Sequence, residues 1–110
     1  MDIVGRETIS IDGVLFDIVQ HGHQLTDTSA TVEAEEVILN GDSLGYCRYD
    51  EETDGWIICD AIGLPRSSDF SSRFTVIKQM VKNASVRSLD AEATLDQWRV
   101  AEARRVYKLR

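Results

Sequence analysis

Two histidines and two cysteines are the side chains of this sequence best suited to metal or thiol chemistry. His21 and His23 flank Gly22, and Cys47 lies 12 residues before Cys59. These are the ligand types of a Cys2His2 zinc site, but a zinc finger separates its two cysteines by only about two to four residues. His21 and His23 also fall in a polar stretch, 21–31, where we expect a solvated loop. The sequence therefore predicts no metal site and no cofactor.

A catalytic thiol is the second chemistry that these residues suggest. Cys47 or Cys59 would need a histidine as its base, with an acid such as Asp60 to orient that histidine. A reactive cysteine also needs a lowered pKa, which a nearby cation or a helix N-terminus supplies. Both cysteines instead fall in predicted strands of an acidic segment, and no phosphate-binding loop, nucleophile elbow or dinucleotide motif is present. We therefore predict no catalytic residue and a protein that is not an enzyme.

The net charge of −7 over 110 residues conceals two halves of opposite charge. Residues 1–60 contain 14 acidic and two basic side chains, a balance of −12, and residues 61–110 contain five acidic and ten basic, a balance of +5. The length fits one domain, 1–110, and no apolar run approaches the roughly 20 residues that span a bilayer. The first residues mix charges with apolar groups, unlike a secretion signal. We therefore expect a cytoplasmic protein with reduced cysteines.

The acidic half alternates short β-rich runs with turn dipeptides, which predicts an antiparallel meander. Asp12-Gly13 and Asn40-Gly41 each separate two such runs, and both dipeptides suit a type I′ turn, in which both central residues have positive φ. An acidic turn, 51–55, follows the fourth run. The predicted strands comprise residues 8–11, 14–19, 32–39, 43–50 and 56–62.

The hairpin around the acidic turn determines which side chains share a face of the sheet. If residues 51–55 form the turn, paired positions sum to 106, so that Cys47 lies opposite Cys59 on the more apolar face. That face would point to the core, and a disulfide would be within reach in an oxidising compartment. Tyr46 and Trp56 would lie together on the outer face.

The basic half has helical periodicity after a break at residues 63–68. Residues 70–86 carry apolar side chains at helical spacing, and residues 88–109 begin with Ser88, a capping residue type, and end in basic turns. The predicted fold class is α+β: a mostly antiparallel sheet of about five strands from residues 1–62, with these two C-terminal helices packed on it.

The second predicted helix has two apolar stripes. A helix that is apolar on two sides packs twice, or packs once and leaves one stripe for a partner. The second stripe would therefore assemble a homodimer or attach the chain to a larger complex. One stripe comprises Leu95, Trp98, Val106 and Leu109, and the other comprises Ala93, Val100, Ala103 and Tyr107.

Carboxylates gather in and around the third to fifth predicted strands. A sheet surface covered with carboxylates resembles an array of phosphates and would be attracted to a basic groove of another protein. Tyrosine and tryptophan are residue types that anchor interfaces. We therefore predict a non-enzymatic protein that binds a basic protein partner. The predicted partner-binding residues are Glu33, Glu35, Glu36, Tyr46, Asp50, Glu51, Glu52, Asp54 and Trp56.

The basic helices suggest nucleic acid as an alternative partner. The overall acidity of the chain opposes this alternative, because specific nucleic-acid-binding domains are usually basic. Helix-end cations also interact favourably with the helix dipole and can pair with the acidic sheet. The basic residues concerned are Arg66, Arg73, Lys78, Lys82, Arg87, Arg99, Arg104, Arg105, Lys108 and Arg110.

Residues 37–62 combine an apolar strand, Asn-Gly-Asp at 40–42, Ser-Leu-Gly-Tyr at 43–46, an acidic turn that ends in Asp-Gly-Trp at 54–56, and another apolar strand. A helix with Phe74 and Ile77 follows. With this pattern, which covers about half of the chain, the sequence resembles the small acidic α+β proteins encoded by phages and other mobile elements, including anti-CRISPR and anti-restriction inhibitors. The resemblance implies an inhibitor or adaptor that occupies a basic nucleic-acid-binding groove of its target. It transfers no functional residues to this chain.

Overall fold

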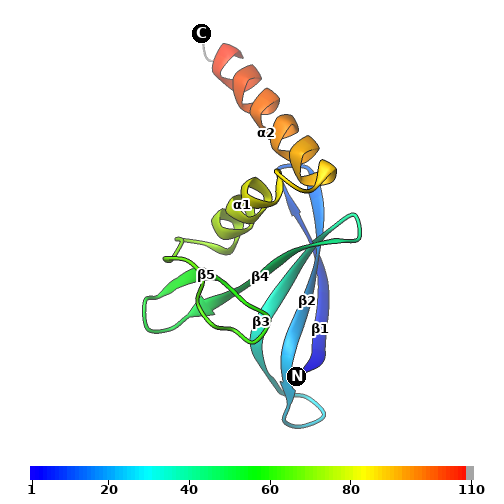
Figure 1. The fold of residues 1–110 in the computed structure, drawn as a ribbon, viewed down its shortest axis with the longest axis vertical. Helices are drawn as coiled ribbons and strands as arrows, with labels where there is room; N and C mark the ends of the chain where they lie inside the picture. The colour runs from blue at the N-terminus through cyan, green and yellow to red at the C-terminus, as the bar shows by residue number, and fades with distance from the viewer. Residues whose placement is uncertain (109–110) are drawn as a thin grey trace.

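A computed structural model describes the backbone of residues 1–108 and the side chains of residues 1–105. Five antiparallel strands form one twisted sheet in the order of the sequence, and two helices follow it (Figure 1). This is the α+β arrangement that the sequence predicts. The elements are β1 (Asp2–Ile11), β2 (Val14–Gln24), β3 (Ala30–Leu39), β4 (Asp42–Asp50), β5 (Gly55–Cys59), α1 (Arg73–Ala84) and α2 (Leu89–Lys108).

The two predicted tight turns are confirmed. Asp12 and Gly13 have φ angles of 47° and 83°, and Asn40 and Gly41 have φ angles of 49° and 85°. Positive φ at both central residues is the signature of a type I′ turn, whose twist matches that of the flanking strands. These local signals therefore establish the β1–β2 and β3–β4 hairpins.

The predicted loop over residues 21–31 is wrong except at its centre. Strand β2 continues to Gln24 and β3 begins at Ala30, so that only residues 25–29 connect them. Polar residues occur here because this end of the hairpin is exposed. Gly22 lies at a register shift where an added Cβ would meet the Thr31 carbonyl oxygen at 1.7 Å, so only glycine allows the two strands to approach.

The predicted register of the β4–β5 hairpin is wrong by one residue. Asp50 pairs with Gly55, which leaves a four-residue loop, 51–54, and paired positions sum to 105. Asp54 ends this loop with a φ of 53°, a left-handed conformation that lets the chain re-enter the sheet one residue early. A shift of one residue turns every side chain of one strand to the opposite face.

The corrected register places the two cysteines on opposite faces. Cys47 lies opposite Ile58 on the face that meets α1, whereas Cys59 lies opposite Tyr46 on the other face. Both thiols are free and buried. Trp56 points to the helix side and packs against the core, so its predicted position on an outer face beside Tyr46 is wrong.

The core lies between the sheet and α1. Ser72 caps α1, since its Oγ accepts a hydrogen bond from the Thr75 backbone N–H at 3.1 Å. The helix buries one face, while Phe74, which fits the predicted apolar pattern, is 53% exposed. The largest fully buried side chains are Phe16, Ile18, Val37, Leu39, Cys47, Val76, Ile77, Met80 and Val81.

The outer edge of β5 is covered by the chain that follows it. The predicted strand 56–62 ends at Cys59, and residues 65–70 return alongside it. The Arg66 N–H donates to the Ile58 carbonyl at 2.8 Å, and Phe70 exchanges two backbone hydrogen bonds with Trp56 at 2.6 and 2.8 Å. The segment between Cys59 and α1 therefore protects a sheet edge that would otherwise be open.

Helix α2 packs once, through its first half only. Ser88 Oγ accepts a hydrogen bond from the Ala91 N–H at 3.2 Å, and Ala91 is fully buried. Beyond Trp98, every described side chain of the helix is exposed. Figure 1 shows this half leaving the body of the molecule, which accounts for its elongated dimensions of 54 × 30 × 26 Å. Leu109 and the side chains of Val106 and Tyr107, which belong to the predicted stripes, lie outside the described residues.

Candidate acidic groove

The end of β4, the β4–β5 loop, the beginning of β3 and the loop after β5 enclose an open hollow of about 420 Å³. We call this hollow the acidic groove. Carboxylates supply much of its wall, but an arginine, a tyrosine and three apolar or small residues complete it. Its lining residues are Val32, Glu33, Arg48, Tyr49, Asp50, Glu51, Glu52, Gly63 and Pro65.

Hydrogen bonds hold the loop of residues 60–65 against β4. Arg48 Nε donates to the Gly63 carbonyl oxygen at 2.7 Å, and Arg48 Nη1 lies 3.8 Å from Asp50. The Asp60 carboxylate accepts hydrogen bonds from the backbone N–H groups of Leu64 at 2.9 Å and Ile62 at 3.1 Å. These bonds, led by that of Leu64, hold the pKa of Asp60 below its ordinary value. The wall of the groove is therefore fixed by specific contacts.

Gly63 allows the loop to approach β3. Its φ of 90° is a conformation that favours glycine, and an added Cβ would lie 2.9 Å from the Glu33 carbonyl oxygen. The sequence-based prediction of the site did not include Arg48, Gly63 or Val32. The Gly63-Leu64-Pro65 segment was the available signal, because glycine and proline mark a chain reversal, but the sequence does not show which strand the reversal contacts.

Gly63→Ala is expected to lower the free energy of unfolding by about 2 kcal/mol, because it adds both backbone strain and a steric clash. Urea denaturation measures this loss. Gly41→Ala is the matched control, since Gly41 has a φ of 85° but no atom within 4 Å of an added Cβ. Equal losses in the two variants would show that the contact with Glu33 has no energetic role.

The groove combines negative charge with exposed apolar surface. Glu33, Glu51 and Glu52 are exposed, and Asp50 is half-buried beside Arg48. Val32 and Tyr49 are exposed within the groove, and Ile62 and Leu64 are exposed in the loop that forms its wall. The Tyr49 hydroxyl donates a hydrogen bond to the Asp54 carboxylate, which raises the pKa of Tyr49. Apolar area framed by charges is the usual composition of a protein-binding surface.

The structure brings together about half of the nine predicted partner-binding residues. Glu33, Asp50, Glu51 and Glu52 line the groove, and Asp54 lies in the same turn. The remaining predicted residues, Glu35, Glu36, Tyr46 and Trp56, lie elsewhere on the sheet.

Glu35 lies under the first turn of α1 and is almost fully buried. Arg73 Nη2 lies 2.7 Å from its carboxylate and also pairs with the exposed Glu7, while the Arg73 guanidinium carbon lies 5.8 Å from the centre of the Trp56 ring. Burial raises the pKa of Glu35, and Arg73 and Gln20 oppose that rise. This carboxylate joins α1 to the sheet, so Glu35 does not lie on an exposed acidic surface as the prediction of a partner-binding residue requires.

Glu36 and Tyr46 lie on the face of the sheet opposite to the helices. Glu36 Oε1 is 3.1 Å from His21 Nε2, and the His21 and Tyr46 rings meet edge to face at 5.7 Å. Burial and the neighbouring Glu36 carboxylate raise the pKa of Tyr46. His21 is thus held by a carboxylate, and within the described part of the chain no group of three or more His, Cys, Asp or Glu side chains is arranged to hold a metal ion.

The two thiols are expected to be unreactive in the folded protein. Burial, with a smaller effect of Glu35, raises the pKa of Cys47 to about 12, and burial raises the pKa of Cys59 to about 11. Because the thiolate is the reacting form, we expect alkylation at pH 8 to be at least about a hundredfold slower in the native protein than in urea. Mass spectrometry of the alkylated protein measures both rates. Rapid native alkylation of one cysteine would restore that residue as a catalytic candidate.

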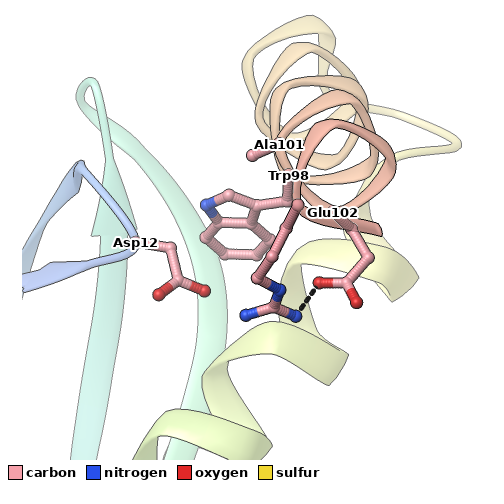
Figure 2. A pocket seen from close by; sticks show the side chains of 5 residues that line it. Asp12, Trp98, Ala101 and Glu102 are labelled. Carbon is pink, nitrogen blue, oxygen red and sulfur yellow. Dashed lines mark hydrogen bonds and ion pairs between the residues drawn. The ribbon is translucent and has the colours of Figure 1, made fainter. Parts of the chain in front are cut away.

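A second hollow, of about 220 Å³, lies where α2 leaves the body. Figure 2 shows Trp98 reaching from α2 toward Asp12 of the β1–β2 turn, with Glu102 on the same side of the helix. Arg105 donates a hydrogen bond to Glu102, which lowers the pKa of that carboxyl. Because these two charged groups already neutralise each other, the acidic groove remains the stronger candidate site.

The chain matches no protein-family model, no curated protein and no solved structure. No helix within residues 1–108 has the length and apolar character that crossing a membrane requires. The function must therefore be inferred from the chemistry of the groove.

Proposed function

We propose that this chain is a small cytoplasmic adaptor or inhibitor, without catalytic activity, that binds a basic protein surface through the acidic groove. One observation carries the proposal: a single open hollow joins the carboxylates of Glu33, Asp50, Glu51 and Glu52 to the exposed side chains of Val32 and Tyr49. Lysine or arginine side chains of a partner would meet the carboxylates, and apolar partner groups would cover Val32 and Tyr49. A groove that ordinarily binds nucleic acid is the kind of partner surface that fits this charge, in agreement with the resemblance to phage inhibitors.

Nucleic acid fits the structure less well as a partner. Of the basic side chains that the sequence suggested, several are paired with carboxylates. Arg66 lies 3.3 Å from Asp60, and Lys78 lies 2.6 Å from Asp12. Arg73 pairs with Glu35 and Glu7, and Arg105 pairs with Glu102. A phosphate would have to compete with these internal partners, so we favour the protein-binding interpretation.

Charge reversal in the groove is expected to slow association. Glu51 and Glu52 are exposed, so their charges act mainly on the rate of encounter and on its salt dependence. The experiment first identifies the partner by affinity capture from a host lysate, then measures association with the purified partner at low and high salt. For Glu51→Lys/Glu52→Lys we expect an association rate at least about tenfold lower at low salt, with a shallower salt dependence.

The control variant Asp2→Lys/Asp42→Lys changes the net charge by the same amount. Both of its sites are exposed, and neither lines the acidic groove. If the two double variants bind equally, net charge rather than the groove governs binding. If neither variant differs from the wild type, the carboxylates of the groove do not contact the partner, and the proposal fails.

A further inference from the structure

The side of α2 opposite to its packed residues has a stripe of exposed residues that are small or apolar at every position except Asp96. The packed side of the helix carries the buried or half-buried residues Ala91, Thr94, Leu95 and Trp98. At about 100° per residue, the opposite side presents Leu89, Ala93, Asp96, Val100 and Ala103. Leu89 is 84% exposed and Val100 is 52% exposed. We call residues 89, 93, 96, 100 and 103 the outward stripe.

The spacing of the outward stripe is that of a coiled-coil seam. Its members are separated alternately by three and four residues, which is a heptad repeat with one polar position, Asp96. On the packed side, the side chains described beyond Trp98 include Glu102 and Arg105, which form an ion pair (Figure 2). Among the described side chains of the projecting half, those of the outward stripe therefore offer an apolar surface to bury.

Isolated helical segments of this length are marginally stable in water, because packing rather than propensity stabilises most helices. The projecting half of α2 buries none of its described side chains. A second helix packed along the outward stripe would supply the missing contact.

We propose that the outward stripe packs, in antiparallel orientation, against the same stripe of a second copy of this chain. The charges of α2 select this occupant and this orientation. Asp90 and Glu92 lie at its beginning, whereas Arg104 lies toward its end. Arg99, near the middle, and Arg105 are paired with Asp96 and Glu102 of their own helix. An antiparallel pair places each acidic end beside the basic end of the partner copy, and a parallel pair would place like charges together.

The heptad spacing gives the register of the pair. Ala93 lies opposite Ala103 of the second copy, Asp96 lies opposite Val100, and Asp90 comes beside Arg104. The small side chains of Ala93 and Ala103 allow close approach of the two helices. Asp96 lies 3.6 Å from Arg99 on its own helix, so its charge stays paired at the middle of the seam. A single polar position of this kind fixes register at some cost in stability.

This dimer is independent of the acidic groove. The groove includes the beginning of β3, whereas α2 begins near Asn40, just beyond the end of that strand. Both grooves of a dimer would therefore remain open to partners, and a failure of either proposal leaves the other intact.

Sedimentation equilibrium of the full chain tests the association. We expect the wild type to dimerise at micromolar concentrations, and Val100→Glu to weaken the dimer at least about tenfold, because it introduces a charge into the seam. Leu25→Glu is the matched control, since Leu25 is an exposed apolar residue in the β2–β3 loop. Circular dichroism establishes that each variant is folded. A wild type that stays monomeric at about 1 mM, or equal association of the wild type and Val100→Glu, would overturn the proposal.

Cross-linking tests the orientation. Ala93→Cys and Ala103→Cys are prepared separately, and each variant and their mixture are treated with a mild oxidant, with the wild type as control for Cys47 and Cys59. The antiparallel register predicts disulfide-linked dimers in the mixture, in excess of either variant alone. Cross-linking of each variant with itself would indicate a parallel pair, and no cross-linking in any sample would contradict the seam. Either result overturns the proposed arrangement.

Discussion

Arg73→Met is expected to lower the free energy of unfolding by about 3 kcal/mol at pH 7. The substitution keeps an unbranched side chain against Trp56 but removes the cation that lies 2.7 Å from the buried Glu35 carboxylate. Loss of one member of a buried ion pair typically costs about 3–5 kcal/mol, because the remaining charge has neither water nor a partner. The half-buried position of Arg73 favours the lower end of that range. Urea denaturation measures the effect.

The pH dependence identifies the cause of this destabilisation. Burial already raises the pKa of Glu35 above its ordinary value, so protonation of Glu35 favours the folded state as the pH falls through that raised pKa. Without Arg73 this pKa rises further, and a protonated Glu35 needs no cation. The difference in stability between the wild type and Arg73→Met should therefore shrink from pH 7 to pH 4. A constant difference would assign the loss to packing.

Two further variants separate the two carboxylates that share Arg73. Arg73→Met/Glu35→Gln should recover most of the stability, because no unpaired charge remains under α1. Glu7→Gln should cost less than about 1 kcal/mol, since Glu7 is exposed and its ion pair is screened by water. If Glu7→Gln proves as costly as Arg73→Met, the exposed ion pair, rather than the buried one, joins α1 to the sheet.

Phe16→Ala is expected to cost about 4 kcal/mol. Phe16 is fully buried between the sheet and the helices, and truncation of such a ring combines lost hydrophobic transfer with a cavity. The ring also lies 6.2 Å from that of Trp98, which anchors α2 to the body. The variant should therefore loosen α2 as well as the core, and urea denaturation together with near-ultraviolet circular dichroism reports both effects.

The matched control for this substitution is Phe74→Ala. Phe74 lies on α1 but is 53% exposed, so the same truncation should cost less than about 1 kcal/mol there. Comparable losses at positions 16 and 74 would mean that Phe74 is covered in solution, which would point to a further interface on α1.

Local sequence signals correctly predicted the turns and helix starts, which are formed by residues close together in the sequence. The Asp12-Gly13 and Asn40-Gly41 turns predicted two hairpins because few other residue pairs adopt positive φ twice. Ser88, a predicted capping residue, and Ser72 mark the beginnings of the two helices through hydrogen bonds that span three residues. Alternating patterns failed at residues 21–24, where both faces of an exposed strand are polar.

The α+β class, the order of the elements and the division into an acidic sheet and basic helices can be predicted from the sequence, because turns, caps and charge depend on local composition. The register of the β4–β5 hairpin emerges only in the folded chain, since the left-handed Asp54 shortens the loop by one residue and so exchanges the faces of β5. The structure also decided which carboxylates are free: Glu35 is buried against Arg73, whereas Glu33, two residues earlier, lines the acidic groove. Burial depends on what packs above a residue, and α1 follows Glu35 by nearly forty positions. For the same reason only the fold shows that α2 leaves the body and exposes its outward stripe.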